Sequence, residues 1–138
     1  MNAMVSWKGQ MAFSGTADRG FTLSLDSSPA SSGENGGFSP MELVLIGLAG
    51  CTAMDDIDIL HKKRQDVTAF EVRVHAGRTE EHPRVFNKVT IEYQITGHNV
   101  EKAAAERAVE LSITKYCSVS AMIAKSAIIE PKITLLEA

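Results

Sequence analysis

The stretch SPMELVLIGLAGC, residues 39–51, is the most apolar run in the chain and ends on one of its two cysteines. Ser39 followed by Pro40 is a helix-start signal, because a serine oxygen can cap free backbone amides and proline fits the first helical turn. The charged segment 55–64 continues the run with acidic and then basic residues. Residues 39–64 are therefore predicted to form one long central helix, buried along its first half and exposed along its second.

Alternating and helical hydrophobic patterns predict shorter elements on either side of this helix. The predicted elements are N-terminal strands within 1–26, a hairpin at 67–97, helices at 99–125 that carry Cys117, and a C-terminal strand at 127–136. Strands and helices do not alternate one by one, which favours an α+β fold in a single domain spanning 1–138. The glycine-rich loop at 26–38 is either a flexible connection or a lid.

Composition excludes several classes of function. Hydrophobic content of 44% and charged content of 22% are ordinary for a soluble globular protein. A net charge of −3 gives no electrostatic case for binding nucleic acid. No run approaches the roughly 18 apolar residues of a membrane span, and the N-terminus lacks an apolar signal core. A cytoplasmic location follows, with no membrane partner.

Cys51 has two readings on the predicted helix. Gly47 lies one turn before it, so the thiol faces either a small recess or a close helix–helix contact. A reactive thiolate so far inside a helix needs a cation from elsewhere, because the helix dipole acts only near the first turn. The sequence offers three arginines for this role and does not choose among them: Arg19, Arg73 and Arg84.

Cys117 also has two readings. It lies at the predicted start of a helix, where the dipole favours a thiolate, although core packing is the favoured explanation of a solitary cysteine. A structural disulfide to Cys51 is not expected in a reducing cytoplasm, so the two cysteines are either buried bystanders or a redox pair.

Metal and cofactor sites find no support in the sequence. The four histidines are widely spaced, and no two cysteines lie near each other, so a zinc signature is absent. The run that contains Asp55, Asp56 and Asp58 lacks the spacing of a calcium loop and is interpreted as a solvated helix face. No metal or organic cofactor is expected.

The chain carries two motifs, Ser39-Pro40-Met41-Glu42-Leu43 running to Gly50-Cys51-Thr52-Ala53, and Tyr116-Cys117-Ser118-Val119. Together these motifs resemble those of the OsmC/Ohr family, the osmotically induced and organic-hydroperoxide-resistance proteins. The hairpin turn His82-Pro83-Arg84-Val85-Phe86 and the patch Arg64-Gln65-Asp66-Val67 extend the resemblance over nearly the whole chain, most closely to the YhfA-type OsmC-like subgroup.

The resemblance implies a fold and an activity. The family fold is an intertwined α+β homodimer with antiparallel strands wrapped around long central helices. Cys51 would be the peroxidatic cysteine, whose thiolate attacks an organic hydroperoxide, and Cys117 would resolve the sulfenic acid into a disulfide. A dithiol partner would then reduce that disulfide.

The resemblance also suggests an activating pair. In the peroxidase branch of the family, a glutamate directly after the proline pairs with an arginine that activates the thiolate. Met41 occupies that position here, and Glu42 follows it. Glu42 and Arg19 are therefore the candidates for this pair. The alternative function is a non-catalytic module that binds a small ligand in the recess between Gly47 and Cys51.

Overall fold

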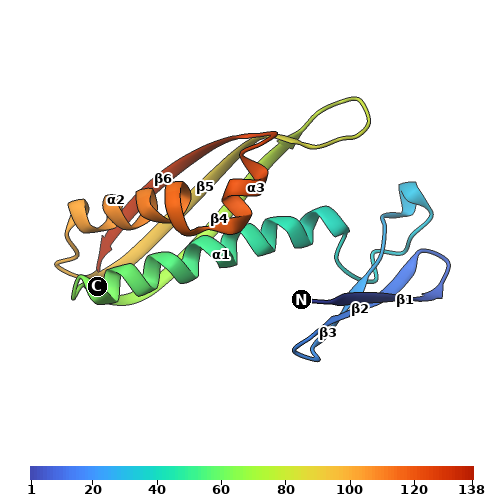
Figure 1. The fold of residues 1–138 in the computed structure, drawn as a ribbon, viewed down its shortest axis with the longest axis horizontal. Helices are drawn as coiled ribbons and strands as arrows, with labels where there is room; N and C mark the ends of the chain where they lie inside the picture. Colours follow the sequence, from blue (N-terminus) through green and yellow to red (C-terminus); the bar gives the residue numbers. More distant parts are fainter. The chain divides into compact units, whose positions relative to one another are not determined.

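The computed structural model describes residues 1–138, which form two compact units, residues 1–45 and residues 46–138. The first unit is built on an antiparallel sheet in the order β1-β2-β3. Its strands are β1 (Ala3–Gly9), β2 (Ala12–Ala17) and β3 (Thr22–Leu25) (Figure 1). Short polar turns join the strands, as the alternation of residues 4–25 predicts.

The loop after β3 is held by one buried carboxylate. Asp26 accepts hydrogen bonds from the backbone N–H groups of Ser27, Glu34 and Gly36 at 2.7, 3.2 and 3.0 Å. Phe38 closes the loop, since its N–H donates to the Ser24 carbonyl at 2.9 Å. The loop also contains a short 3₁₀ turn, η1 (Pro29–Ser31). These bonds give the glycine-rich segment a defined path.

The long helix begins where the sequence predicts. α1 (Pro40–Lys62) starts with a capping box: Glu42 accepts the N–H of Ser39 at 2.7 Å, and its own N–H donates to the Ser39 hydroxyl at 3.3 Å. None of the helices is long and apolar enough to span a bilayer.

Within the single chain, the buried positions of α1 fall in both of its halves and not only in its first half. Its buried side chains are Leu48, Thr52, Asp56 and Leu60, whereas Val44 and Ile46 in the first half are 39% and 52% exposed. The four buried residues recur every fourth position and so share one face of the helix. The apolar run as a whole does not show which face is buried, because it is apolar on every side.

The second unit packs its helices against one sheet in the order β4-β5-β6. β4 (Asp66–Arg78) and β5 (Phe86–His98) form the predicted antiparallel hairpin. β6 (Ile128–Glu137) pairs with β5 in parallel, unlike the antiparallel strands expected from the family resemblance. The parallel pairing follows from the two helices between β5 and β6, which carry the chain back to the start of the sheet. Pro131 lies on this edge strand.

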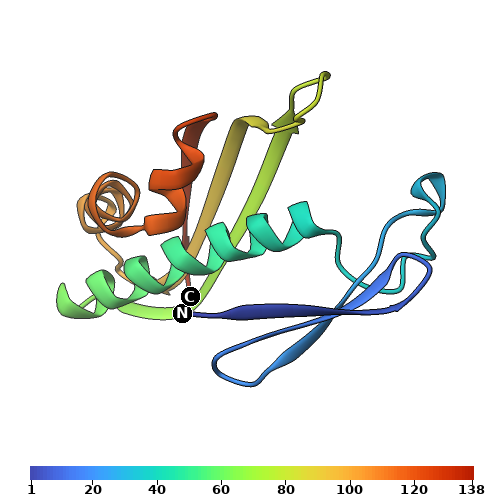
Figure 2. The same cartoon turned by 45° about the vertical axis from the view of Figure 1, so that its right-hand side comes forward.

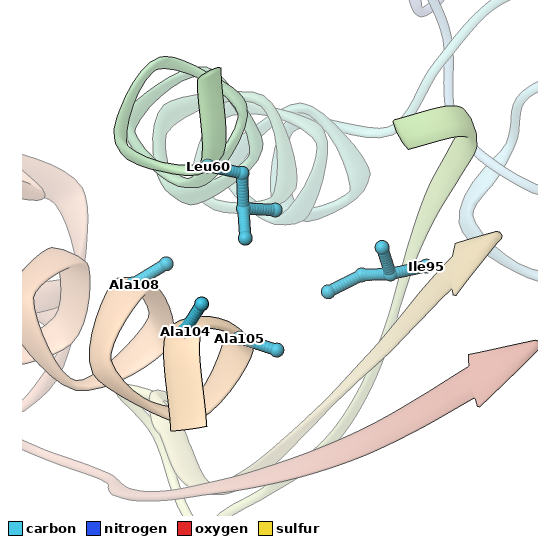
Figure 3. Close-up of a cluster of buried hydrophobic side chains, with 5 residues drawn as sticks. All are labelled: Leu60, Ile95, Ala104, Ala105 and Ala108. Atoms are coloured by element: carbon cyan, nitrogen blue, oxygen red, sulfur yellow. The ribbon is translucent and has the colours of Figure 1, made fainter. Parts of the chain in front are cut away.

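The helices lie on one face of this sheet (Figures 1 and 2). α2 (Lys102–Leu111) is followed by a π-helical turn, η2 (Ser112–Tyr116), and then by α3 (Ser118–Ile123). Figure 3 shows the core that joins them: Leu60 of α1 packs against Ala104, Ala105 and Ala108 of α2 and against Ile95 of β5. The fold is thus of the predicted α+β class.

Candidate active site: a two-cysteine cluster

The second unit brings the two cysteines together from elements 66 positions apart. Cys51 lies on α1 and is half-buried, and Cys117 lies between η2 and α3 and is buried. Asp55 follows Cys51 by one helical turn, so the two side chains share a face of α1. The two sulfur atoms and a carboxylate oxygen of Asp55 all lie within 4.8 Å of one another. Both cysteines are free thiols.

A break in the helical path positions Cys117. The N–H of Cys117 donates to the Ser112 carbonyl at 2.8 Å, which is the i→i+5 bond that closes the π turn. Cys117 is then the N-cap of α3, where its sulfur accepts the N–H of Ser120 at 3.3 Å. The cysteine is therefore fixed at the junction of two helical segments, as the sequence predicts.

The electrostatic expectation for Cys117 is wrong. Burial raises the pKa of the Cys117 thiol, the neighbouring Cys51 raises it further, and the bond from Ser120 only partly offsets both. Desolvation disfavours the charged form, and the six-residue α3 does not compensate for it. The Cys117 thiol therefore loses its proton less readily than an ordinary cysteine.

A chain of hydroxyl groups leads from the core to Asp55. Thr52 Oγ1 lies 2.9 Å from the phenolic oxygen of Tyr93 and 2.9 Å from Ser112 Oγ, and Ser112 Oγ lies 3.0 Å from Asp55 Oδ2. A carboxylate only accepts, and each hydroxyl has one hydrogen. The Ser112 hydroxyl therefore donates its only hydrogen to Asp55 and must accept a hydrogen bond from Thr52. Thr52 in turn has no second hydrogen, so it accepts a hydrogen bond from the Tyr93 hydroxyl. All three hydrogens then point toward Asp55.

This chain is deeply buried. Thr52, Tyr93 and Ser112 are at most 1% exposed. Burial raises the pKa of the Tyr93 phenol above its usual range, so Tyr93 holds its hydrogen and can serve as a donor. Ser112 thus ties the end of α2 to α1 and fixes one oxygen of Asp55 beside the two thiols.

Asp56 contradicts the prediction that the acidic run is a solvated face. It is fully buried, and neither of its carboxylate oxygens has a hydrogen-bond partner. Desolvation, with a smaller contribution from the charge of Asp55, raises the Asp56 pKa to about 7. Asp56 follows Thr52 by four positions and therefore falls on the buried face of α1. Asp58, by contrast, is exposed and paired with Lys62.

The two other predicted site residues lie in the first unit. Glu42 is engaged in the capping box at the start of α1, as described above. Arg19 lies in the turn between β2 and β3, where it helps to line an apolar groove of about 790 Å³ within the first unit. Their catalytic role stays a prediction.

Four residues of the cluster were missed by sequence reasoning: Thr52, Asp55, Tyr93 and Ser112. Asp55 had one available signal, its spacing of four from Cys51 on a helix. Thr52 lies on α1 itself, and its partners Tyr93 of β5 and Ser112 at the end of α2 come from elements whose packing against α1 no local pattern specifies.

Comparison with known proteins agrees with this architecture. The family described as "OsmC-like protein" matches residues 33–132. Protein YhfA of Escherichia coli K12 is 40% identical over 126 residues, which is 91% of each chain. A hypothetical protein from Aquifex aeolicus VF5 has a solved structure that superimposes with a TM-score of 0.87 at 30% identity, covering 99% of this chain and 96% of that one.

A more distant structure shares the fold alone. An organic hydroperoxide resistance protein OsmC from Legionella pneumophila superimposes with a TM-score of 0.74 at 17% identity over 97% of both chains. The family match covers well over half of the chain, and the identity with YhfA extends over nearly all of it. The chain belongs to the OsmC-like protein family.

Proposed function

We propose that this protein is a thiol-dependent peroxidase that reduces organic hydroperoxides through Cys51 and Cys117. The observation that carries the proposal is the approach of the two sulfur atoms to within 4.8 Å. The Legionella structure with the same fold is named an organic hydroperoxide resistance protein, which supports this substrate class. The protein would thereby protect a cell against oxidative stress.

The chemistry balances with two thiols and one hydroperoxide. The Cys51 thiol gives two electrons to the O–O bond, which breaks to leave Cys51 sulfenic acid and an alcohol. The Cys117 sulfur then attacks the Cys51 sulfur, forming a disulfide and releasing water. An external dithiol returns both cysteines to thiols and becomes a disulfide itself.

Asp55 is suited to assist the second step. The Cys117 thiol has a raised pKa, so its proton must pass to a base as the sulfur attacks. The Asp55 carboxylate lies within 4.8 Å of both sulfurs and is held by Ser112. It can accept the Cys117 proton and pass it to the departing hydroxide. Cys51 would be activated by Arg19 with Glu42, as the family resemblance suggests.

The peroxidase would act as a homodimer. The exposed face of α1 carries large apolar side chains, among them Ile46 and Met54 at 52% and 73% exposure. Gly47 and Gly50 have open space where a Cβ would lie, so a second helix could approach closely there. Covering this face removes apolar surface from water.

The test is hydroperoxide consumption by the reduced protein with an excess dithiol. Cys51→Ser should abolish turnover. In a separate reaction without dithiol, Cys117→Ser should still consume about one equivalent and accumulate a sulfenic acid that a dione reagent traps. Unchanged turnover by Cys51→Ser overturns the proposal.

One observation favours the second candidate, a binding module for a small ligand. Burial raises the pKa of Cys117, and no nearby cation lowers it. The surroundings of Cys117 therefore favour the neutral thiol over the reactive thiolate. The pH dependence of Cys51 alkylation separates the two candidates. A Cys51 pKa well below 7 supports the peroxidase, and one at or above the ordinary value of about 8.5 supports the binding module.

A further inference from the structure

We propose that Cys51, Asp55 and Cys117 form a binding site for a soft divalent cation, with Zn²⁺ as the best match. The three side chains present two sulfur atoms and one carboxylate oxygen within 4.8 Å of one another. Zinc prefers this combination of thiolate and carboxylate ligands. The sequence gives no hint of it, because the ligands are separated by 3 and 61 intervening residues rather than by the short spacings of zinc motifs.

The geometry suits a tetrahedral ion. With metal–sulfur bonds of about 2.3 Å and metal–oxygen bonds of about 2.0–2.2 Å, neighbouring ligand atoms in a tetrahedral site lie roughly 3.5–3.8 Å apart. The present separations of up to 4.8 Å close to these values by side-chain rotation of Cys51 and Asp55 on one helical face. Three protein ligands leave the fourth position for water.

The surroundings of the ligands are those of a supported metal site. The Ser120 N–H donates to the sulfur of Cys117, and the Ser112 hydroxyl donates to Oδ2 of Asp55. Such bonds orient metal ligands and add to metal affinity. Oδ1 of Asp55 accepts no such bond and stays available for the ion. Two thiolates and a carboxylate would also leave three negative charges in a half-buried place, which a divalent ion largely neutralises.

Zinc binding would withdraw both thiols from oxidation and alkylation. The inference does not depend on the proposed peroxidase activity, because it is tested without any hydroperoxide. The probe is Zn²⁺ itself, titrated into the reduced, metal-free, full-length protein in competition with a chromophoric chelator. Co²⁺ provides a second readout, since a thiolate-to-cobalt charge-transfer band reports sulfur ligation directly.

We expect one Zn²⁺ per chain with Kd below about 1 μM, a free energy of about −8 kcal/mol. Cys51→Ser and Cys117→Ser should each weaken binding at least about 100-fold, and Asp55→Asn about 10-fold. Asp58→Asn is the matched control on the same helix and should bind like the wild type, because Asp58 is exposed and paired with Lys62.

Three results overturn the proposal: a wild-type Kd above about 100 μM, a cobalt complex without the charge-transfer band, or an Asp55→Asn variant with wild-type affinity. If a variant does not fold, alkylation of the wild type still decides the question. One equivalent of Zn²⁺ per chain should slow the alkylation of both cysteines. Equal alkylation rates with and without the ion would show that the two cysteines do not bind it.

Discussion

Ser112 donates a hydrogen bond to Asp55 at 3.0 Å, which joins the end of α2 to α1 beside the two thiols. The bond holds a carboxylate within 4.8 Å of both sulfur atoms, and under the proposed mechanism this carboxylate accepts the proton of Cys117 as the disulfide forms. Asp55→Asn keeps the shape and removes the acceptor charge. In chelator-treated protein, we expect sulfenic acid to form at the wild-type rate but the disulfide to form about 10- to 100-fold more slowly.

The measurement for Asp55→Asn is rapid-quench mass spectrometry after one equivalent of alkyl hydroperoxide, with Asp58→Asn as the control. A variant that forms disulfide at the wild-type rate removes Asp55 from the mechanism. If the variant forms no sulfenic acid, Asp55 acts instead in the first step, the reaction of Cys51 with the hydroperoxide.

Thr52 links Tyr93 to Ser112 through two bonds of 2.9 Å in the fully buried interior. Thr52→Val is isosteric, leaves the buried Tyr93 hydroxyl without its partner and removes one of the two hydrogen bonds of Ser112. The expected loss in the free energy of unfolding is about 1–3 kcal/mol. Urea denaturation measures it. The exposed Thr68→Val on β4 is the control and should stay within about 0.5 kcal/mol of the wild type, and an equally small effect of Thr52→Val contradicts the hydroxyl chain.

Asp56 makes folding stability depend on pH. Its pKa is about 7 in the folded protein and near 3.8 in an unfolded chain, so the folded state binds the extra proton between these values. Stability should therefore fall as pH rises from about 4 to 7, by on the order of 3–4 kcal/mol for this group alone. The groups that face Asp56 are Asp55 on the same helix, which raises its pKa, and Tyr93 on β5.

Asp56→Asn removes this dependence. Chemical denaturation of metal-free protein at pH 5 and pH 8 should show the variant gaining stability relative to the wild type at the higher pH. Asp58→Asn should keep the wild-type profile. Parallel profiles for wild type and Asp56→Asn show that Asp56 does not titrate in this window.

Leu60 fills the space between α1, the alanine face of α2, and Ile95. Leu60→Ala leaves a cavity that the rigid helix pair cannot close, so we expect a loss of about 2–5 kcal/mol in the free energy of unfolding. Thermal or urea unfolding measures it. Met122→Ala truncates a side chain that is 66% exposed and should cost far less. Equal costs contradict the assignment of this cluster as the core of the second unit.

The sequence predicts elements that depend on local signals. The start of α1 can be predicted from the capping residues Ser39, Pro40 and Glu42. The strands β4 and β5 can be predicted from the strict alternation of apolar and polar residues along them. The parallel pairing of β6 and the π turn at Ser112–Tyr116 depend on packing between distant segments, which no local pattern records.

Some residues of the candidate site can likewise be predicted from the sequence, and others cannot. The two cysteines are recognisable because their motifs resemble a family. Asp56 and Asp55 look alike in sequence, as members of one acidic run, yet one is fully buried and the other lies beside the thiols. Their difference arises from a rotation of about 100° per residue around a helix whose buried face the apolar run does not define.

The central claim is that Cys51 and Cys117 act as one redox pair, and disulfide mapping tests it most directly. Reduced, metal-free protein is mixed with one equivalent of an alkyl hydroperoxide, digested without reductant and mapped by mass spectrometry. The account predicts a Cys51–Cys117 disulfide within one chain and loss of both free thiols. Two cysteines that remain free, while a known peroxidase consumes the same hydroperoxide, would contradict it.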